Sequence, residues 1–173
     1  MTNNICKICL GYLLDHPELT GWLKCNNCGF CKKSEKSMLT IQELNPKNFP
    51  LTPEQEANLL ILHEKINKIR LAWGKPMIVT SGFRSMEDHL RIYKELAVKR
   101  HQTYDESKVP MASKHLYGKA VDISDPDGSL YQWCQDNVKV LEDVGLWLEI
   151  KDDQHRVHFQ TEAPKSGSRF FHP

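Results

Sequence analysis

The sequence lacks several features that would define its class at once. It has no run of about 18 apolar residues, so no segment is long enough to cross a bilayer as a helix. Its formal net charge of +1 argues against a nucleic-acid binder that depends on bulk positive charge. The N-terminus lacks the basic start, apolar stretch and small-residue cleavage site of a signal peptide. We therefore expect the protein to be made in the cytoplasm and to remain there unless another process releases it.

Low complexity and internal repeats are also absent. Hydrophobic residues make up 40% and charged residues 26% of the chain, which is typical of a soluble globular protein. A length of 173 residues allows one ordinary domain with a small appendage. The polar stretch "CKKSEKS" suggests a linker, so we divide the chain into a segment 1–36 and a domain 38–173.

Cysteine is scarce except at one end, where five of the six cysteines fall within the first 31 residues. Cys6, Cys9, Cys25 and Cys28 form two Cys-x2-Cys pairs 15 residues apart, which is the spacing of a zinc ribbon. A reducing compartment favours thiolate–metal binding over disulfides, and four thiolates complete a structural zinc site. Cys31 is spare and could replace Cys28. The segment therefore predicts a structural zinc, with a docking or targeting role favoured over nucleic-acid binding.

Capping signals and apolar spacing predict helices in the domain. Thr52 and Gln55 fit the N-cap and capping box of a helix, whose apolar residues continue at helical spacing to Trp73. Gly74 would end that helix. Helices are also expected after Ser85 and, interrupted near Asn137, over residues 129–145, where Cys134 would be an inert buried thiol.

Short runs of β-forming residues lie between and after these helices. They are at residues 77–81, 119–124, 146–150 and 155–159. The last two are close enough to form an antiparallel hairpin, which argues against a doubly wound parallel sheet. We therefore expect an α+β fold with a small, mostly antiparallel sheet and flanking helices.

Three residues of metal-ligand type lie in or beside the expected strands. Asp122 alternates with Val121 and Ile123, so it faces away from the core, and His158 alternates with apolar neighbours in the same way. If the two strands are adjacent, both side chains enter one cleft that His115 can reach from the preceding loop. Two imidazoles and one carboxylate with an open fourth position are typical of catalytic zinc. Spacing alone also fits a hydrogen-bonded surface pair.

A longer pattern separates these alternatives. The sequence reads Ser113-x-His115-x-x-Gly118-x-Ala120-x-Asp122, with "SGFRS" before it and "VHFQ" after it. This pattern resembles the zinc D-Ala-D-Ala carboxypeptidase family, which includes vancomycin-resistance dipeptidases and phage peptidoglycan endopeptidases. That family shares its fold with the hedgehog signalling domain, so the resemblance implies a hedgehog/DD-peptidase-like domain.

The resemblance covers about residues 76–160 and implies roles at the matching positions. His115, Asp122 and His158 would hold the zinc. Arg84 would lie beside the metal, where it would stabilise oxyanion charge or bind a substrate carboxylate. Ser113 would donate a hydrogen bond to the substrate. For Arg84, the alternative is an ordinary surface ion pair.

The general base is where the chain departs from its relatives. Many members have a glutamate three residues before the last zinc histidine, and this chain has His155 there. If the hairpin paired Ile150 with His155, Glu149 would face Arg156 and lie on the metal side of the sheet. We rank His155 first because it holds the motif position of the glutamate, and Glu149 second because it would lie on the metal side of the sheet. The turn acids Asp152 and Asp153 also remain open.

These features favour a zinc metallopeptidase that cuts amide bonds in peptidoglycan peptides, with one catalytic and one structural zinc. The absence of a signal peptide favours a phage endolysin-type endopeptidase, which acts after release. A cytoplasmic D,D-dipeptidase or carboxypeptidase is the enzymatic alternative. A non-catalytic zinc-binding interaction module is the alternative from another class, because the glutamate is missing. The expected partners are peptidoglycan or its peptides, with neither nucleic acid nor membrane.

Overall fold

The computed structural model describes residues 13–15, 22–25, 31–33, 38–150 and 155–172. The first three ranges are strands β1 (Leu13–Asp15), β2 (Trp22–Cys25) and β3 (Cys31–Lys33), which form an antiparallel sheet in the order β1-β2-β3. The predicted zinc ribbon remains a prediction, since Cys6, Cys9, Cys28 and the side chain of Cys25 lie outside what is described. No helix in the described residues is long and apolar enough to traverse a bilayer.

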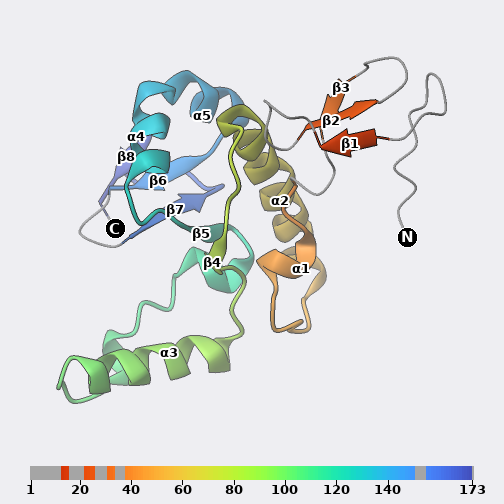
Figure 1. Ribbon diagram of the computed structural model, residues 1–173. Coiled ribbons are helices and arrows are strands. Elements are labelled where there is room, and N and C mark those ends of the chain that lie inside the picture. The colour runs from red at the N-terminus through yellow and green to blue at the C-terminus, as the bar shows by residue number, and fades with distance from the viewer. Residues whose placement is uncertain (1–12, 16–21, 26–30, 34–37, 151–154, 173) are drawn as a thin grey trace.

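The domain after residue 37 is an α+β unit, as predicted (Figure 1). Its helices are α1 (Ile41–Leu44), α2 (Pro53–Trp73), α3 (Met86–Lys99), η2 (Glu106–Lys108), η3 (Lys114–Tyr117), α4 (Ser129–Asp136) and α5 (Val138–Val144). Its strands are β4 (Val79–Ser81), β5 (Ala120–Ser124), β6 (Trp147–Glu149), β7 (Arg156–Gln160) and β8 (Phe170–Phe171).

A five-stranded sheet in the order β4-β5-β7-β6-β8 forms the centre of the domain. All neighbours are antiparallel except β6 and β8, which are parallel. In Figure 1, α2 runs beside the sheet with α5 close to it, while α3 extends away from the sheet. One face of the sheet is thus covered by α2 and α5.

The covered face is apolar because alternate strand residues point to it. Val121 and Ile123 of β5 and Val157 and Phe159 of β7 are almost fully buried there, together with α2 residues. The buried apolar residues of α2 are at helical spacing: Leu59, Leu62, Ile66 and Ile69. Burying such side chains contributes about 1.5–3 kcal/mol each, so this layer holds the sheet in place.

The predicted helix boundaries are confirmed. Thr52 and Gln55 form a capping box at the start of α2, and Gly74 ends that helix in the left-handed region with φ 75°. The Ser85 side chain caps α3, and Asn137 separates α4 from α5. These signals act through neighbouring backbone groups, so they can be read from short stretches of sequence.

The hairpin register differs from the expected pairing of Ile150 with His155. Trp147 pairs with Gln160 and Leu148 with Phe159, which is a shift of two residues. Because side chains alternate with a period of two, an even shift keeps Glu149 on the face of His158 and changes only its neighbours. The expected pairing of Ile150 with His155 was therefore wrong, while the expectation that Glu149 lies on the metal side of the sheet is confirmed.

Candidate metal centre and active site

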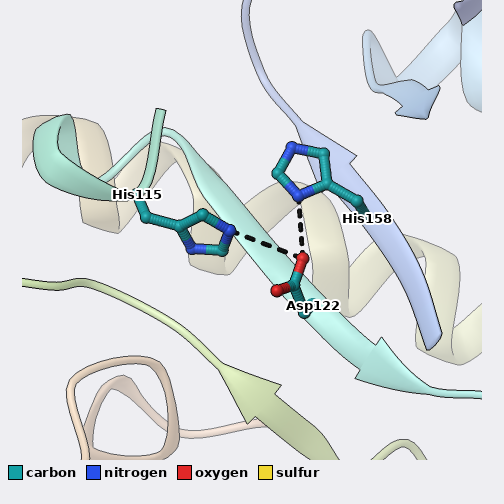
Figure 2. A group of neighbouring side chains, drawn as sticks. All are labelled: His115, Asp122 and His158. Atoms are coloured by element: carbon teal, nitrogen blue, oxygen red, sulfur yellow. Dashed lines mark hydrogen bonds and ion pairs between the residues drawn. The ribbon is translucent and has the colours of Figure 1, made fainter. Parts of the chain in front are cut away.

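The two strands at the middle of the sheet bring Asp122 and His158 together. β5 and β7 are antiparallel and place these residues directly opposite each other, on the face away from the core. His115 lies in η3, immediately before β5, and its ring points at the same carboxylate (Figure 2). The three predicted ligands therefore meet, as the alternation in the sequence indicated.

The three side chains lie within metal-binding distance of one another. His158 Nδ1 is 2.8 Å and His115 Nε2 is 3.4 Å from the same oxygen, Asp122 Oδ1. One potential ligand atom from each residue lies within 4.8 Å of the others. Asp122 is 1% exposed and His115 is 4% exposed, so this cluster is largely removed from water.

The hydrogen bond at the far side of the His115 ring sets its protonation. Its Nδ1 lies 2.8 Å from the Gly82 carbonyl oxygen. A carbonyl can only accept, so Nδ1 carries the hydrogen, and the neutral ring presents the Nε2 lone pair to Asp122. This carbonyl contact is the kind of support that orients metal-binding histidines.

The protonation of His115 bears on whether the cluster can hold a metal. Burial lowers the pKa of His115 and outweighs the raising effect of Asp122, which favours the neutral ring. A lone pair and a carboxylate oxygen therefore face each other, which is favourable only with a proton or metal ion shared between them. The residues present fit a divalent metal.

Two arginines surround the other Asp122 oxygen. Arg156 Nη1 lies 3.1 Å and Arg84 Nη2 lies 3.6 Å from Oδ2. This buried oxygen accepts no hydrogen bond from the described residues, so the arginines compensate it by charge alone. Arg84 is held in place because its Nε and Nη2 both donate to Ser81 Oγ, at 2.9 and 2.8 Å.

Two glycines are required by the backbone around the metal ligands. A Cβ on Gly82 would lie 2.0 Å from the Leu44 carbonyl oxygen, so only glycine allows the approach that positions the carbonyl beneath His115. Gly118 follows η3 with φ 69°, and a Cβ there would lie 2.8 Å from the Gln55 carbonyl oxygen. The motif glycine thus lets the chain turn from His115 into β5.

Ser113 lies at the start of η3, half-buried and two residues from His115. Its amide donates to the Pro110 carbonyl oxygen at 3.1 Å, and the buried His89 of α3 contacts the same oxygen through Nε2 at 3.2 Å. α3 therefore supports the loop that carries Ser113. The hydroxyl makes no capping hydrogen bond, and its substrate contact remains a prediction.

The two main general-base candidates are placed differently. Glu149 is half-buried at the end of β6, on the sheet face shared with His158. His155 is exposed in the bend before β7, and its Nδ1 lies 3.2 Å from the Pro126 carbonyl oxygen. Asp152 and Asp153 lie outside the described residues. Glu149 therefore shares the metal face of the sheet, and the identity of the general base stays a prediction.

Sequence reasoning did not assign Ser81, Gly82 and Arg156 to the site. Ser81 and Gly82 are part of the "SGFRS" stretch, in which attention fell on the arginine alone. Arg156 alternates with His158 on β7 and so belongs to the metal face. Strand alternation was the signal that could have identified it.

Comparisons with known proteins agree with this architecture. The D-alanyl-D-alanine carboxypeptidase (VanY) family matches residues 53–169, and the chain belongs to that family. The matched range includes all the metal-site residues described above. Membership supports a hydrolase of peptidoglycan peptides.

A solved structure is also similar, the L-Ala D-Glu endopeptidase ChiX of Serratia marcescens. It is 21% identical, with 72% of this chain and 98% of that chain covered, and the TM-score is 0.39. We draw nothing about substrate from a similarity of this size. A comparison with curated proteins gave no match.

Proposed function

We propose that the protein is a zinc-dependent hydrolase of amide bonds in peptidoglycan peptides, with His115, Asp122 and His158 as the metal ligands. One observation carries this proposal: His115, Asp122 and His158 each place one potential ligand atom within 4.8 Å of the others, and the Gly82 carbonyl holds His115 Nδ1 at 2.8 Å. Two imidazoles, one carboxylate and an open position are the ligand set of catalytic zinc.

The protein residues would divide the work of hydrolysis between them. Bound zinc supplies Lewis acidity, which polarises the scissile carbonyl and allows water to attack at neutral pH. Arg84 is held rigidly by Ser81 beside the site and would stabilise the negative charge that develops on the carbonyl oxygen. Glu149 would remove a proton from the attacking water and later pass it to the leaving amine. Ser113 would orient the substrate.

Two cleavage patterns are consistent with these roles. The resemblance of the His115–Asp122 motif to phage enzymes supports an endolysin-type endopeptidase, made in the cytoplasm and acting on the wall after release. Membership of the carboxypeptidase family favours removal of a terminal D-alanine as the second candidate.

Product analysis distinguishes these patterns. Zinc-loaded protein is incubated separately with purified peptidoglycan and with a peptide ending in D-Ala-D-Ala, and the products are identified by mass spectrometry. Release of free D-alanine supports the carboxypeptidase, and an internal cut supports the endopeptidase. No new amine in either digest would contradict the proposed function.

A second zinc ion is proposed for Cys6, Cys9, Cys25 and Cys28 on the basis of their spacing. Metal analysis of reduced protein should then give two zinc ions per chain. A mild chelator should remove the three-ligand zinc first, because four thiolates bind more tightly than an open site. One zinc per chain, lost together with activity, would remove the ribbon from the proposal.

A further inference from the structure

We propose that Arg156 is a specificity-determining residue that binds a carboxylate of the substrate beside the metal. The proposal rests on the proposed function and deepens it by naming the chemical group that the site selects. Arg156 comes from β7, two residues before His158 and on the same face of the sheet.

The first observation is that two guanidinium groups share one carboxylate oxygen. Arg156 approaches Asp122 Oδ2 to 3.1 Å and Arg84 approaches it to 3.6 Å, and neither donates a hydrogen bond to it. A guanidinium has five N–H donors, so one such contact leaves most of its capacity unused. One of the two arginines is therefore available for another anion.

The second observation identifies which arginine is available. The Arg84 side chain is 12% exposed and is fixed by its two hydrogen bonds to Ser81. The Arg156 side chain is 39% exposed and donates no hydrogen bond within the described part of the chain. Its outer edge reaches solvent while its Nη1 reaches the metal site, as a substrate-binding group requires.

The third observation is the charge on this face. Asp122 and Glu149 carry two negative charges, and Arg84 and Arg156 carry two positive charges, so the four cancel. A divalent metal then leaves an excess of two positive charges, which favours an anionic ligand. The metal also neutralises Asp122, which weakens the hold of that carboxylate on Arg156 and frees the guanidinium. The forked geometry of arginine matches a carboxylate.

Two kinds of peptide carboxylate could meet Arg156. One is the C-terminal carboxylate next to a terminal amide bond, and the other is the free carboxylate of an acidic residue beside an internal bond. The test uses an acid and its amide for each kind: a peptide ending in D-Ala-D-Ala, and a peptide with D-glutamate beside the scissile bond. Only one of the two acid–amide pairs should show a strong preference for the acid. That pair identifies which kind of carboxylate binds Arg156.

The kinetics of cleavage and the calorimetric affinity for each acid and amide are measured on zinc-loaded native protein, R156Q, R156K and R100Q. The amide lacks the charge-assisted hydrogen bond to Arg156, so native protein should prefer one acid over its amide by about tenfold or more. R156Q should lose most of this preference through KM, with little change in kcat, and R156K should be intermediate. R100Q removes an exposed arginine at the end of α3 and should match native protein. An unchanged preference in R156Q, or none in native protein, overturns the proposal.

Zinc affinity provides a readout that does not depend on activity. Removing a positive charge beside Asp122 should strengthen zinc binding in R156Q by about threefold to tenfold, from the Coulomb repulsion that is lost. Equal or weaker zinc binding in R156Q would show that Arg156 does not compete with the metal for Asp122 and would overturn the proposal. If native protein cleaves no peptide, the proposed function fails, while the calorimetric preference for acid over amide still decides the role of Arg156.

Discussion

At the scale of single residues, the account depends most on Asp122. Replacing Asp122 by asparagine keeps the shape of the side chain but removes the charge that offsets two arginines and attracts the metal. Two imidazoles alone bind zinc poorly, and loss even of a supporting residue costs about 10–100-fold in affinity. We expect the affinity of D122N for the zinc of the three-ligand site to fall by about a hundredfold or more in a competitive titration. Native-like zinc binding in D122N would remove Asp122 from the ligand set.

The general base gives a paired test at the same scale. Glu149 shares the face of His158, whereas His155 is exposed and contacts Pro126. We therefore expect E149Q to lower kcat by about a hundredfold or more, the usual scale for a lost general base. H155Q is the matched control and should keep most of its activity and all of its zinc. The opposite result would restore His155 as the base.

The pH dependence of metal-free stability tests the neutral His115. Burial holds the pKa of this ring below its ordinary value of 6.5. The unfolded chain therefore binds the proton more readily than the folded chain below pH 6.5, so the free energy of unfolding should fall as pH drops through that window. Urea denaturation between pH 5 and 8 measures this slope, and H115N should flatten it. An equal slope in H115N would show that other groups cause it.

At the scale of secondary-structure elements, the "SGFRS" turn couples β4 to the metal site. A Cβ on Gly82 would lie 2.0 Å from the Leu44 carbonyl oxygen, so G82A must push β4 and α1 apart. We expect a loss of about 3 kcal/mol or more in the free energy of unfolding, because overpacking against backbone cannot be relieved by a rotamer change. Gly167 has φ 68°, and a Cβ on it would have nothing within 4 Å, so G167A should cost only about 1–2 kcal/mol for its backbone conformation. Equal losses in chemical denaturation would contradict the close approach.

Elements with local signals could be predicted from the sequence. The caps of α2 and α3, the break at Asn137 and the facing of Asp122 and His158 all depend on neighbouring residues. The hairpin register could not be predicted, because alternation defines which face a residue takes and not its partner across the strands. The parallel pairing of β8 with β6 joins segments distant in sequence and has no local signal.

At the site, the metal ligands could be predicted and their supports could not. The contact of His115 with the Gly82 carbonyl and the approach of Arg156 to Asp122 depend on how three strands and η3 meet. Cys134 illustrates the simpler case, since its place in a helical run predicted burial. Cys134 is fully buried, as predicted, and burial raises the pKa of this thiol to about 12.

At the scale of the whole molecule, the sheet separates stability from chemistry. The apolar face packs on α2 and α5, while the metal face carries the charged residues. Removing the metal of the three-ligand site should therefore abolish activity and leave the far-ultraviolet circular dichroism of the domain unchanged. Unfolding on mild chelation would show that this metal is part of the structural core.

The central claim is that this domain hydrolyses peptidoglycan peptides only with a metal at His115, Asp122 and His158. The most direct measurement is mass spectrometry of a peptidoglycan digest by native protein, chelated protein, chelated protein with zinc restored, and zinc-loaded D122N. The account predicts new amines with native and restored protein and none with the other two. Cleavage by chelated protein or by D122N at the native rate would contradict it.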